Sequence, residues 1–587
     1  MSGVSIIFKN VRHLSMKTMR WLWLLGLVVV AFRYLSPSMS DKQARPITTW
    51  VESVRDVASI RRENHLTHRT VTDRSNQNPD QFRKSVNHSI ASINEIHQTH
   101  LKKIGLQSAE EGNWLTICRR LSLALVGQGL SLEEIRSLQN APETERVDIH
   151  LQNLFKDPRY HNYWAERWTR YLVGTDGGQF IVYRRRRFRI WLSEVIAENR
   201  PYDEIVRKLL TAEGLWTDRP EVNFYTATFD SNNGQADPIR LASRTARVFL
   251  GLRIDCLQCH DDFLGNVNLG DRDQVREGKQ QDFHQLAAFF SAAKTNGLQG
   301  LKKGFSNYKY QYLDAKEEVT VEPKVPFAEH LMPDLKDPRE RLAAWITHEE
   351  NHQAAVAAVS HVWALIFGKP FGEAVDNLPL DRSSQPILDE LAKDFIAHQF
   401  DLRRLITVIT GLKAFRCDSR ADFPITEEHE DQYAVFPLMQ LRPEQVAGAI
   451  IQASRIKKTD RDSSLLLQFI SFTSTNEFVE RFGDRGEDEL EPENVTISQR
   501  LLMMNGKMVR ESIESNPILN TTAHLAMFSK DDSQLIESAY LCTLNRFPSE
   551  NEHQHFLKRL QTGKNRNQAV VDLMWVLTNS SELTWNH

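Results

Sequence analysis

The sequence predicts an all-α protein, mainly helical, with two helical domains, irregular loops and an N-terminal hydrophobic signal or anchor helix. Glycine and proline are sparse, with 26 and 21 among 587 residues, which does not suit a β-sandwich or a collagen-like chain. Apolar residues recur at intervals of three and four in many segments, the spacing of one helix face. No repeat of fixed period is visible, so we do not expect a solenoid.

Two local patterns illustrate the helical prediction. Four large apolar residues follow one another at intervals of four: Tyr160, Trp164, Trp168 and Leu172. They share one face of a predicted helix and indicate an aromatic core seam, with a cofactor wall as the alternative. Ser131 and Glu134 have the spacing of a capping box, so we expect a helix to begin there, after a break at Gly127 and Gly129.

Residues 1–40 have the layout of a secretory signal or signal anchor. Four basic residues precede the apolar run from Trp21 to Phe32, namely Lys9, Arg12, Lys17 and Arg20. Arg33 follows the run. We expect a cytoplasmic basic segment and an uncleaved anchor, which places the body of the chain in the extracytoplasmic, periplasmic space. A cleaved signal, which would make the protein secreted, and a buried core helix are the alternatives.

Composition divides the remaining chain into four segments. Residues 41–110 are polar and contain five of the twenty histidines, so we expect a solvated linker that becomes helical towards its end. Residues 111–300 form one helical domain, residues 301–337 an irregular connector and residues 338–587 a second helical domain. The 73 basic and 76 acidic residues leave no basic field, so we do not expect nucleic acid as a partner.

Residues 256–260 read Cys-Leu-Gln-Cys-His, the C-x-x-C-H pattern of covalent haem attachment. Two thiols one turn apart reach the two vinyl groups, and the next histidine is delivered to the iron as its proximal ligand. The sequence therefore predicts haem c held by Cys256, Cys259 and His260. Haem attachment takes place outside the cytoplasm, which agrees with the predicted N-terminal signal.

Other chemistry stays open for the same residues. Zinc would accept Cys256, Cys259 and His260, with Asp262 or His284 as a fourth ligand. The two thiols could also form a disulfide or stay inert. The chain has five cysteines, so a framework in which every cysteine is paired is excluded. A thioredoxin-like dithiol is disfavoured, because that motif follows a strand and a long predicted helix precedes this one.

Three arginines extend the predicted haem site. Arg240, Arg244 and Arg247 lie on one face of the helix that leads to the motif. Guanidinium groups there would pair with haem propionates, although a solvated polar face explains the pattern equally well.

The composition of the predicted domain limits which residues could serve as the sixth ligand of the iron. All eleven methionines lie at or before Met39 or at or after Met332, so the predicted domain 111–300 offers no methionine. Its other imidazoles are those of His150, His161 and His284. We favour His284, which follows the motif by one loop, and an open distal side is the alternative.

Several segments, taken in order, resemble those of a known family. They include RRLSLALVGQGLSLEEI, YWAERWTRYL, RVFLGLRIDCLQCHD and DFHQLAAFFSAAK, followed by PILDELAKDFIAHQFDLRRLITVI, LRPEQVAGAI and YLCTLNRFPSENE. The order is similar to that in planctomycete secreted cytochrome-like proteins, which are built from two adjoining domains of unknown function. This resemblance spans about residues 113–587 and implies a mostly helical, exported protein with a haem-c motif. It supplies no reaction.

The chain departs from those relatives at several positions. Asp262 stands where they carry a second histidine after the motif. In the second domain, Ser360-His361 replaces an Asn-Arg pair, Asp376-Asn377 an Asp-Asp pair, and Met439-Gln440-Leu441 an Arg-Arg-Leu run. An acid–base or anion-binding role of those family positions is therefore not carried over to this chain.

The sequence as a whole predicts a membrane-tethered, extracytoplasmic, monohaem c-type cytochrome-like protein that exchanges electrons with a redox partner. The alternative is a non-haem scaffold or interaction protein in which Cys256 and Cys259 form a disulfide or a zinc site. No paired-carboxylate or Ser-His-Asp pattern stands out, so no catalytic residue is assigned.

Overall fold

The computed structural model describes residues 79–587, apart from 176–182, 230, 231, 233, 272, 273, 296–299, 305, 381–384, 458–477, 484–489, 491–495, 515–519 and 564. The predicted signal or anchor in residues 1–40 lies outside the described residues, as does the first part of the predicted linker. No helix in the described part of the chain is long and apolar enough to cross a membrane.

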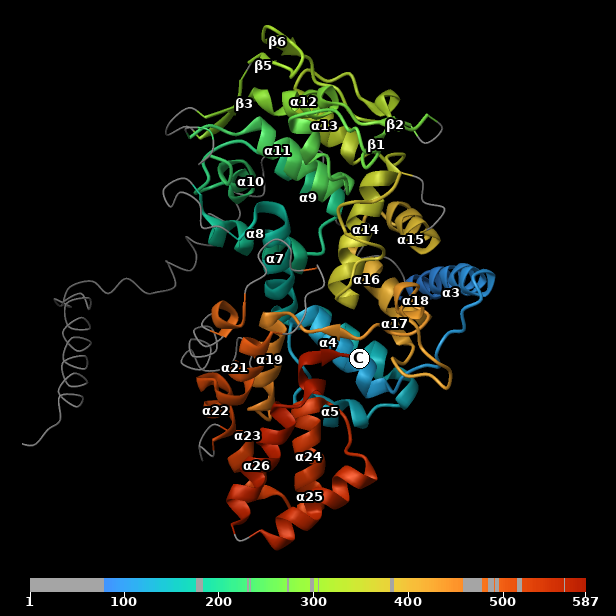
Figure 1. Cartoon of the computed structure of the whole chain (residues 1–587), viewed down its shortest axis with the longest axis vertical. Coiled ribbons are helices and arrows are strands. Elements are labelled where there is room, and N and C mark those ends of the chain that lie inside the picture. The colour runs from blue at the N-terminus through green and yellow to red at the C-terminus, as the bar shows by residue number, and fades with distance from the viewer. Residues whose placement is uncertain are drawn as a thin grey trace, which may run out of the picture. The chain divides into compact units, whose positions relative to one another are not determined.

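The described residues are mostly α-helical, which confirms the prediction of a mainly helical protein (Figure 1). The α-helices are α3 (Pro79–Lys103), α4 (Trp114–Val126), α5 (Leu132–Gln139), α6 (Arg146–Lys156), α7 (Pro158–Val173), α8 (Arg185–Ala197), α9 (Tyr202–Leu210), α10 (Asn223–Thr226), α11 (Pro238–Thr245), α12 (Gln280–Ala288), α13 (Pro338–Ile346), α14 (His352–Phe367), α15 (Pro386–Ala397), α16 (Leu402–Gly411), α17 (Lys413–Arg416), α18 (Glu427–Asp431), α19 (Pro443–Ala453), α21 (Ile497–Asn505), α22 (Lys507–Ile513), α23 (Thr521–Phe528), α24 (Asp532–Leu544), α25 (Glu550–Thr562) and α26 (Arg566–Thr578).

Strands are few and short in the described residues. They form antiparallel pairs, β1 with β2, β3 with β4, β5 with β6 and β7 with β8. Their bounds are β1 (Asn268–Leu269), β2 (Arg276–Glu277), β3 (Ala293–Thr295), β4 (Leu301–Lys303), β5 (Tyr308–Tyr310), β6 (Val319–Val321), β7 (Met439–Gln440) and β8 (Trp585–Asn586). Two short turns matter for the site, the π-helical η5 (Ala246–Leu250) and the 3-10 helix η6 (Asp255–Gln258).

The predicted break and capping box between α4 and α5 are present. α4 ends at Gly127, whose φ of 68° lies in the left-handed region that favours glycine. A Cβ atom at that position would lie 2.4 Å from the ring of Tyr163. At the start of α5, the Ser131 hydroxyl oxygen accepts the N–H of Glu134 at 3.2 Å, and the Glu134 carboxylate accepts the N–H of Ser131 at 2.8 Å.

The aromatic face of α7 is buried. The four residues of the predicted seam are at most 4% exposed. The indole N–H of Trp164 donates to the carbonyl oxygen of Ala124 at 3.2 Å, and α7 packs against α4 and α8. Burial of such large side chains contributes strongly to the core, at roughly 25 cal/mol per Å² of apolar surface.

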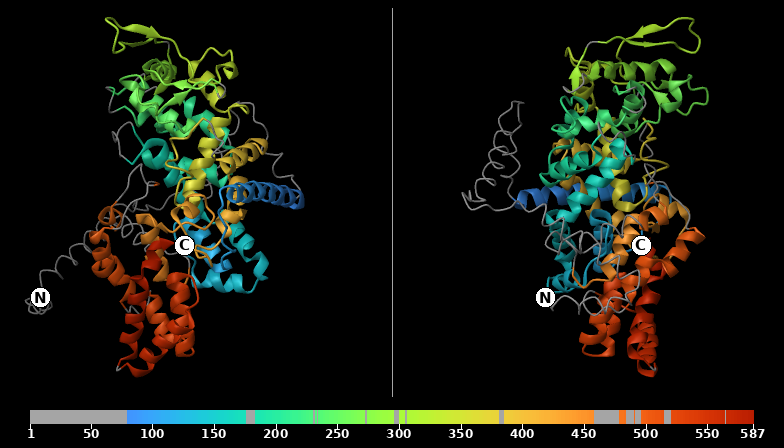
Figure 2. Two further views of the ribbon diagram at one scale, coloured as in Figure 1. Left: turned by 45° about the vertical axis from the view of Figure 1, so that its right-hand side comes forward. Right: turned by 90° about the vertical axis from the view of Figure 1, so that its left-hand side faces the viewer.

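The end of the predicted linker is folded. Helix α3 packs against α15 and α16, as the views in Figures 1 and 2 show, and buries a narrow stripe of residues: Val86, Ile93, His97 and Leu101. His97 Nε2 lies 2.8 Å from the carbonyl oxygen of Gln432, and burial lowers the pKa of His97 to about 4. The helical end predicted for this segment is therefore present at residues 79–103, and it packs on the core through the one helix face on which its few apolar side chains fall.

Helix α14 lies at the centre of the core. Every residue of α14 after His352 is buried. The helix contacts α4 and η5 as well as α15 and α16, so it packs on elements from both predicted helical domains. Residues 79–587 form one compact unit, and its main hydrophobic core extends from Val86 to Cys542. A second, smaller core lies among α19 and α21–α26 and includes Leu123 of α4.

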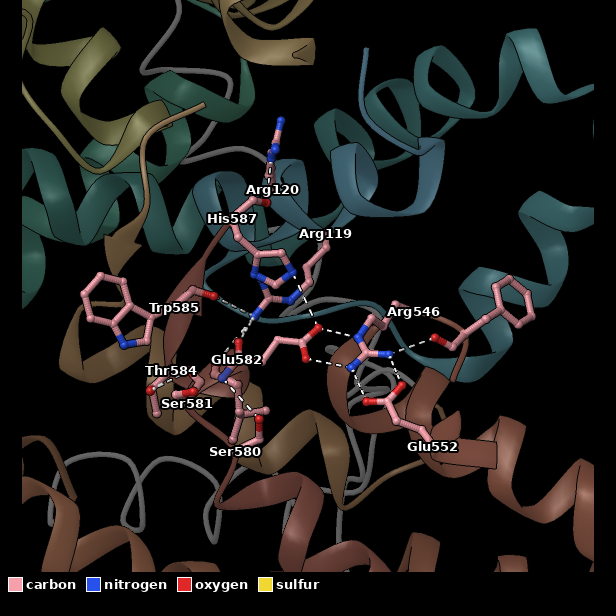
Figure 3. Close-up of polar contacts among 12 residues, drawn as sticks. Arg119, Arg120, Arg546, Glu552, Ser580, Ser581, Glu582, Thr584, Trp585 and His587 are labelled. Carbon is pink, nitrogen blue, oxygen red and sulfur yellow. Dashed lines mark hydrogen bonds and ion pairs between the residues drawn. The ribbon is translucent and has the colours of Figure 1, made fainter. Parts of the chain in front are cut away.

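Arg119 of α4 holds the last described turn of the chain. Its side chain is 3% exposed, and Nη2 donates to the carbonyl oxygens of Glu582 and Trp585 at 3.1 and 3.0 Å (Figure 3). Glu582 is held from its other side by Arg546, whose Nη2 donates to the Glu582 carboxylate at 2.8 Å. The pKa of Arg119 is lowered to about 10 by burial.

Arg120, the next residue, is completely buried. Its Nε donates to the carbonyl oxygen of His587 at 2.8 Å, and its Nη1 donates to those of Phe415 and Cys417 at 2.8 and 2.7 Å. The guanidinium carbon lies 3.6 Å from the centre of the Phe436 ring. We call Arg119 and Arg120 the arginine clamp, because they join α4 to two distant segments of the chain.

Candidate functional site

The chain approaches the C-x-x-C-H motif through α11 and η5. Asp237 caps α11 by accepting the N–H of Ile239 at 2.9 Å. The segment ends at Gly251, whose φ is 63° and whose Cβ position would lie 2.6 Å from Leu378 Cδ1. The carbonyl oxygen of Gly251 accepts the N–H of Leu378 at 2.8 Å, which fixes the start of the motif against the chain that follows α14.

The motif itself forms a single tight turn. The N–H groups of Cys259 and His260 donate to the carbonyl oxygen of Cys256 at 3.2 and 3.4 Å. Leu257 is fully buried and anchors the turn, whereas Cys256 and Cys259 are exposed and are not joined by a disulfide. Partial burial and the charge of Asp262 raise the pKa of Cys256, so this thiol is protonated at neutral pH.

His260 is exposed beside the two thiols, and its tautomer is defined. Its Nδ1 lies 2.6 Å from the carbonyl oxygen of Asp261, which can only accept, so Nδ1 carries the proton. In the neutral imidazole, Nε2 then holds the lone pair that a metal would need. The ring stacks against Phe263 with centroids 6.0 Å apart, and Phe263 and Leu264 are 79% and 82% exposed.

Asp262, which replaces a histidine of the resembled proteins, shapes the following loop. Its carboxylate accepts the N–H of Val267 at 2.6 Å and the N–H of Leu264 at 3.1 Å. The hydrogen bond from Val267 is the main reason that the pKa of Asp262 lies below its usual value. Both of its oxygens thus accept backbone N–H groups of the following loop.

His284 of α12 braces the motif from inside the protein. Its Nε2 lies 3.0 Å from the carbonyl oxygen of Gln258, so Nε2 carries the proton, and its Nδ1 accepts from the Tyr308 hydroxyl at 2.9 Å. The same carbonyl also accepts from Gln280 and from the Tyr310 hydroxyl, each at 3.1 Å. His284 is fully buried, and burial lowers its pKa.

The predicted ligand roles of His284 compete with these contacts. Ligation of iron or zinc through Nε2 would break the hydrogen bond to the Gln258 carbonyl of the motif turn, and ligation through Nδ1 would break the hydrogen bond from Tyr308. The other two imidazoles also have partners: His150 Nε2 lies 2.7 Å from the Ser122 hydroxyl, and His161 Nε2 lies 3.2 Å from the Phe155 carbonyl oxygen. In the described ranges, no three histidine, cysteine or acidic side chains form a group that could hold a metal ion.

A cavity of about 220 Å³ lies next to the motif, and it is lined by all three predicted arginines. Arg240 and Arg244 extend from α11 and Arg247 from η5. Gln258 of the motif and Arg253, which precedes it, also line the cavity. We call this cavity the arginine pocket. Cys256, Cys259 and His260 do not line it, so the thiols and the arginines occupy adjacent places joined by Gln258.

The opposite wall of the arginine pocket comes from α14 and the chain after it. Asp376 is 2% exposed and accepts from Arg247 Nε at 2.8 Å and from Arg253 Nε at 2.7 Å. This shared carboxylate orients two of the guanidinium groups along the wall. Glu373 is the other acidic residue among the described residues of the lining.

His361 of α14 also lines the arginine pocket. It is 1% exposed, stacks on Tyr171 with centroids 3.8 Å apart, and meets the edge of Trp168. Neither ring nitrogen has a hydrogen-bond partner in the described part of the chain. Burial lowers the pKa of His361 to about 3, so the imidazole is neutral at neutral pH.

The sequence gives little indication of the residues that line the pocket opposite α11. His361 and Asp376 were noted as departures from the resembled proteins, without a role, and Arg253 and Tyr171 were not noted. The signal that was available is the pattern of arginines before the motif, which predicts an anion near α11. The partners across the pocket lie more than a hundred residues further along the chain.

Residues 92–295 match the model of PSCyt2, a protein of unknown function (DUF1549), and residues 338–560 match that of PSD1, a protein of unknown function (DUF1553). The chain carries both domains. This confirms the predicted pairing of two adjoining domains of unknown function. No curated protein and no solved structure matches the chain.

The arginine pocket is shared between the two matched domains. Tyr171, the arginines of α11 and η5, Arg253 and Gln258 belong to the PSCyt2 range, whereas His361 and Asp376 belong to the PSD1 range. The thiols and His260 lie entirely in the PSCyt2 range. The pocket therefore requires both domains, while the motif requires one.

Proposed function

We propose that the chain is a membrane-tethered, extracytoplasmic haem-c protein that exchanges electrons with a partner in that compartment. The observation that carries this proposal is the arrangement at residues 256–260. Two free, exposed thiols lie one turn apart, and the exposed imidazole beside them has Nδ1 bound to the Asp261 carbonyl. These are the groups that covalent haem attachment needs, in the required tautomer.

The surroundings of the motif fit a haem that lies on the surface. Phe263 and Leu264 are large, apolar and almost fully exposed beside His260, although each would gain free energy from burial. A porphyrin attached at Cys256 and Cys259 would give them an apolar partner. The arginine pocket is too small for a porphyrin, since pockets for drug-sized ligands begin at about 300 Å³.

Haem c bound here would supply one-electron chemistry. The chain's own residues would fix its position through the thiols of Cys256 and Cys259 and orient His260 Nε2 towards the metal. The Asp261 carbonyl holds the imidazole in the ligating tautomer. His284 holds the Gln258 carbonyl, and with it the geometry of the turn, against the interior.

The distal side of this site is proposed to be open. The 111–300 range contains no methionine, and His284 uses both ring nitrogens. A small molecule or water would then complete the coordination, which suits a protein that binds a ligand as well as transferring electrons. The assignment of Arg240, Arg244 and Arg247 to the propionates stays a prediction.

A reduced pyridine haemochrome spectrum tests the proposal. The full chain is produced in a host with haem-c maturation and compared with the variant Cys256→Ser/Cys259→Ser. We expect a haem-c spectrum from the wild type and none from the variant. A wild-type protein without a Soret band overturns the proposal, and a zinc assay on that sample then tests the non-haem scaffold. Carbonate extraction of the membrane fraction tests the tether, because a tethered protein stays in the membrane after this wash.

A further inference from the structure

The arginine pocket is rich in guanidinium groups among its described lining residues. Four of the described lining residues are arginines and two are carboxylates, and Asp376 binds both Arg247 and Arg253. Guanidinium groups present several donors in a fixed plane, which matches the oxygens of carboxylate, sulfate or phosphate. A concave, partly enclosed site strengthens such an interaction relative to an open surface.

His361 is an independent sign that the pocket takes a ligand. A buried imidazole with two unpartnered nitrogens is costly, because each nitrogen has lost its hydrogen bond to water. Its ring is held in place by Tyr171 and Trp168. Its hydrogen-bonding capacity is therefore available to a group, or to an ordered water, that enters the pocket.

The size and lining of the pocket limit the ligand. A volume of about 220 Å³ admits an inorganic oxyanion or a short carboxylic acid. Ile239, Val248 and Val375 give part of the wall an apolar character. The pocket thus suits a small anion that carries a few carbon atoms at most.

We infer that the arginine pocket is a binding site for a small oxyanion, either a short carboxylate or an inorganic anion such as sulfate. The site goes beyond the proposed redox function and does not depend on haem, because the thiols and His260 lie outside the pocket. It places an anion-binding function at the junction of the PSCyt2 and PSD1 domains. The ligand would contact side chains of both.

Isothermal titration of the haem-free variant Cys256→Ser/Cys259→Ser tests this inference directly. The probes are sodium acetate, sodium succinate, sodium sulfate and sodium phosphate, at an ionic strength held constant with sodium chloride. We expect saturable binding of at least one probe at one site per chain. Preference for acetate or succinate identifies a carboxylate site, and preference for sulfate or phosphate identifies an inorganic anion site.

Three further variants, made in the same haem-free background, locate the binding. Arg240→Gln/Arg244→Gln and His361→Phe should each lower the affinity about tenfold or more, because each removes groups that would contact the anion. Arg186→Gln is the matched control, since Arg186 is exposed on α8 outside the pocket, and it should bind as the parent does. His361→Phe keeps an aromatic ring of similar size, so a folded protein is expected.

The inference is overturned if none of the four probes binds above the chloride background. It is also overturned if both pocket variants, shown to be folded by circular dichroism, bind as tightly as the Arg186→Gln control. Loss of haem from the wild type would leave this experiment unchanged, so failure of the redox proposal and failure of the anion site are separable.

Discussion

The arginine clamp and the arginine pocket use the same side chain in different surroundings. In the clamp, Arg119 and Arg120 are buried and donate to backbone carbonyl oxygens, so their hydrogen bonds link segments of the chain. In the pocket, Arg247 and Arg253 remain 32% and 41% exposed while they share Asp376, and they border a cavity. Burial against carbonyls indicates a structural role, whereas partial exposure around a cavity indicates a role in binding.

The largest predicted effect separates the clamp from the pocket. Arg120→Met should lower the free energy of unfolding by about 3–5 kcal/mol, because three buried carbonyl oxygens lose their donor. Urea unfolding followed by circular dichroism measures the change. The control Arg186→Met removes an exposed arginine and should change stability by less than about 0.5 kcal/mol. Equal stability of the two variants would contradict the structural role of the clamp.

The carboxylate of the pocket should matter less for stability. Asp376→Asn leaves two half-exposed guanidinium groups without their shared carboxylate, so we expect a loss of about 1–2 kcal/mol after allowance for solvent screening. It should also tighten binding of an oxyanion, since one negative charge leaves the wall. Asp148 pairs with two arginines on the surface, so Asp148→Asn is the control and should be nearly neutral. Weaker oxyanion binding by Asp376→Asn would contradict the prediction that the negative charge of Asp376 opposes an anion in the pocket.

The buried imidazole of the pocket predicts a dependence of stability on pH. The pKa of His361 is lowered to about 3, so the unfolded chain binds a proton below pH ~6.5 that the native protein does not bind. Stability therefore falls as the pH drops through this window, with a slope of about 1.4 kcal/mol per pH unit from this residue. His361→Phe should lower the slope of the free energy of unfolding against pH by the contribution of one proton. Unfolding measurements between pH 4 and 7 give this slope.

The exposed His88 offers a control for that slope. His88→Gln removes an exposed imidazole and should leave the dependence as it is in the wild type. His97 and His150 also have pKa values lowered to about 4, so a residual slope is expected in the His361→Phe variant. An unchanged slope in His361→Phe would show that His361 is not neutral in the native protein.

The smallest predicted effect on stability is that of Arg240→Gln. The side chain is half-buried and lines the pocket, and its replacement by glutamine should shift the free energy of unfolding by only about 0.5 kcal/mol. Affinity for an oxyanion should fall all the same. A measurable loss of stability with unchanged anion affinity would assign Arg240 to the structural group and narrow the contrast between the two sets of arginines.

Local features of this protein could be read from its sequence, and contacts between distant segments could not. The capping box of Ser131 and the buried face of α7 depend on spacings of three and four, which sequence shows directly. The sequence indicates a helix at the end of the polar segment but not the packing of α3, because only four of its side chains are buried in an otherwise polar stretch.

The same distinction holds at the site. The C-x-x-C-H turn and the line of Arg240, Arg244 and Arg247 follow from local spacing. The partner of His284 is a backbone carbonyl, which no residue pattern reveals. The pairing of Asp376 with Arg247 and Arg253 joins positions more than 120 residues apart, and it arises only when α14 packs against η5.

The intact mass of the purified protein tests the central claim most directly. The full chain and the variants Cys256→Ser and Cys118→Ser are produced in a host with haem-c maturation and denatured before mass spectrometry. We predict that the wild type retains the mass of one covalent haem. Cys118→Ser should retain it as well, because this change removes only a buried thiol of α4. Cys256→Ser should lose at least one of the two thioether bonds. A wild-type mass equal to that of the polypeptide alone would contradict the haem-c assignment.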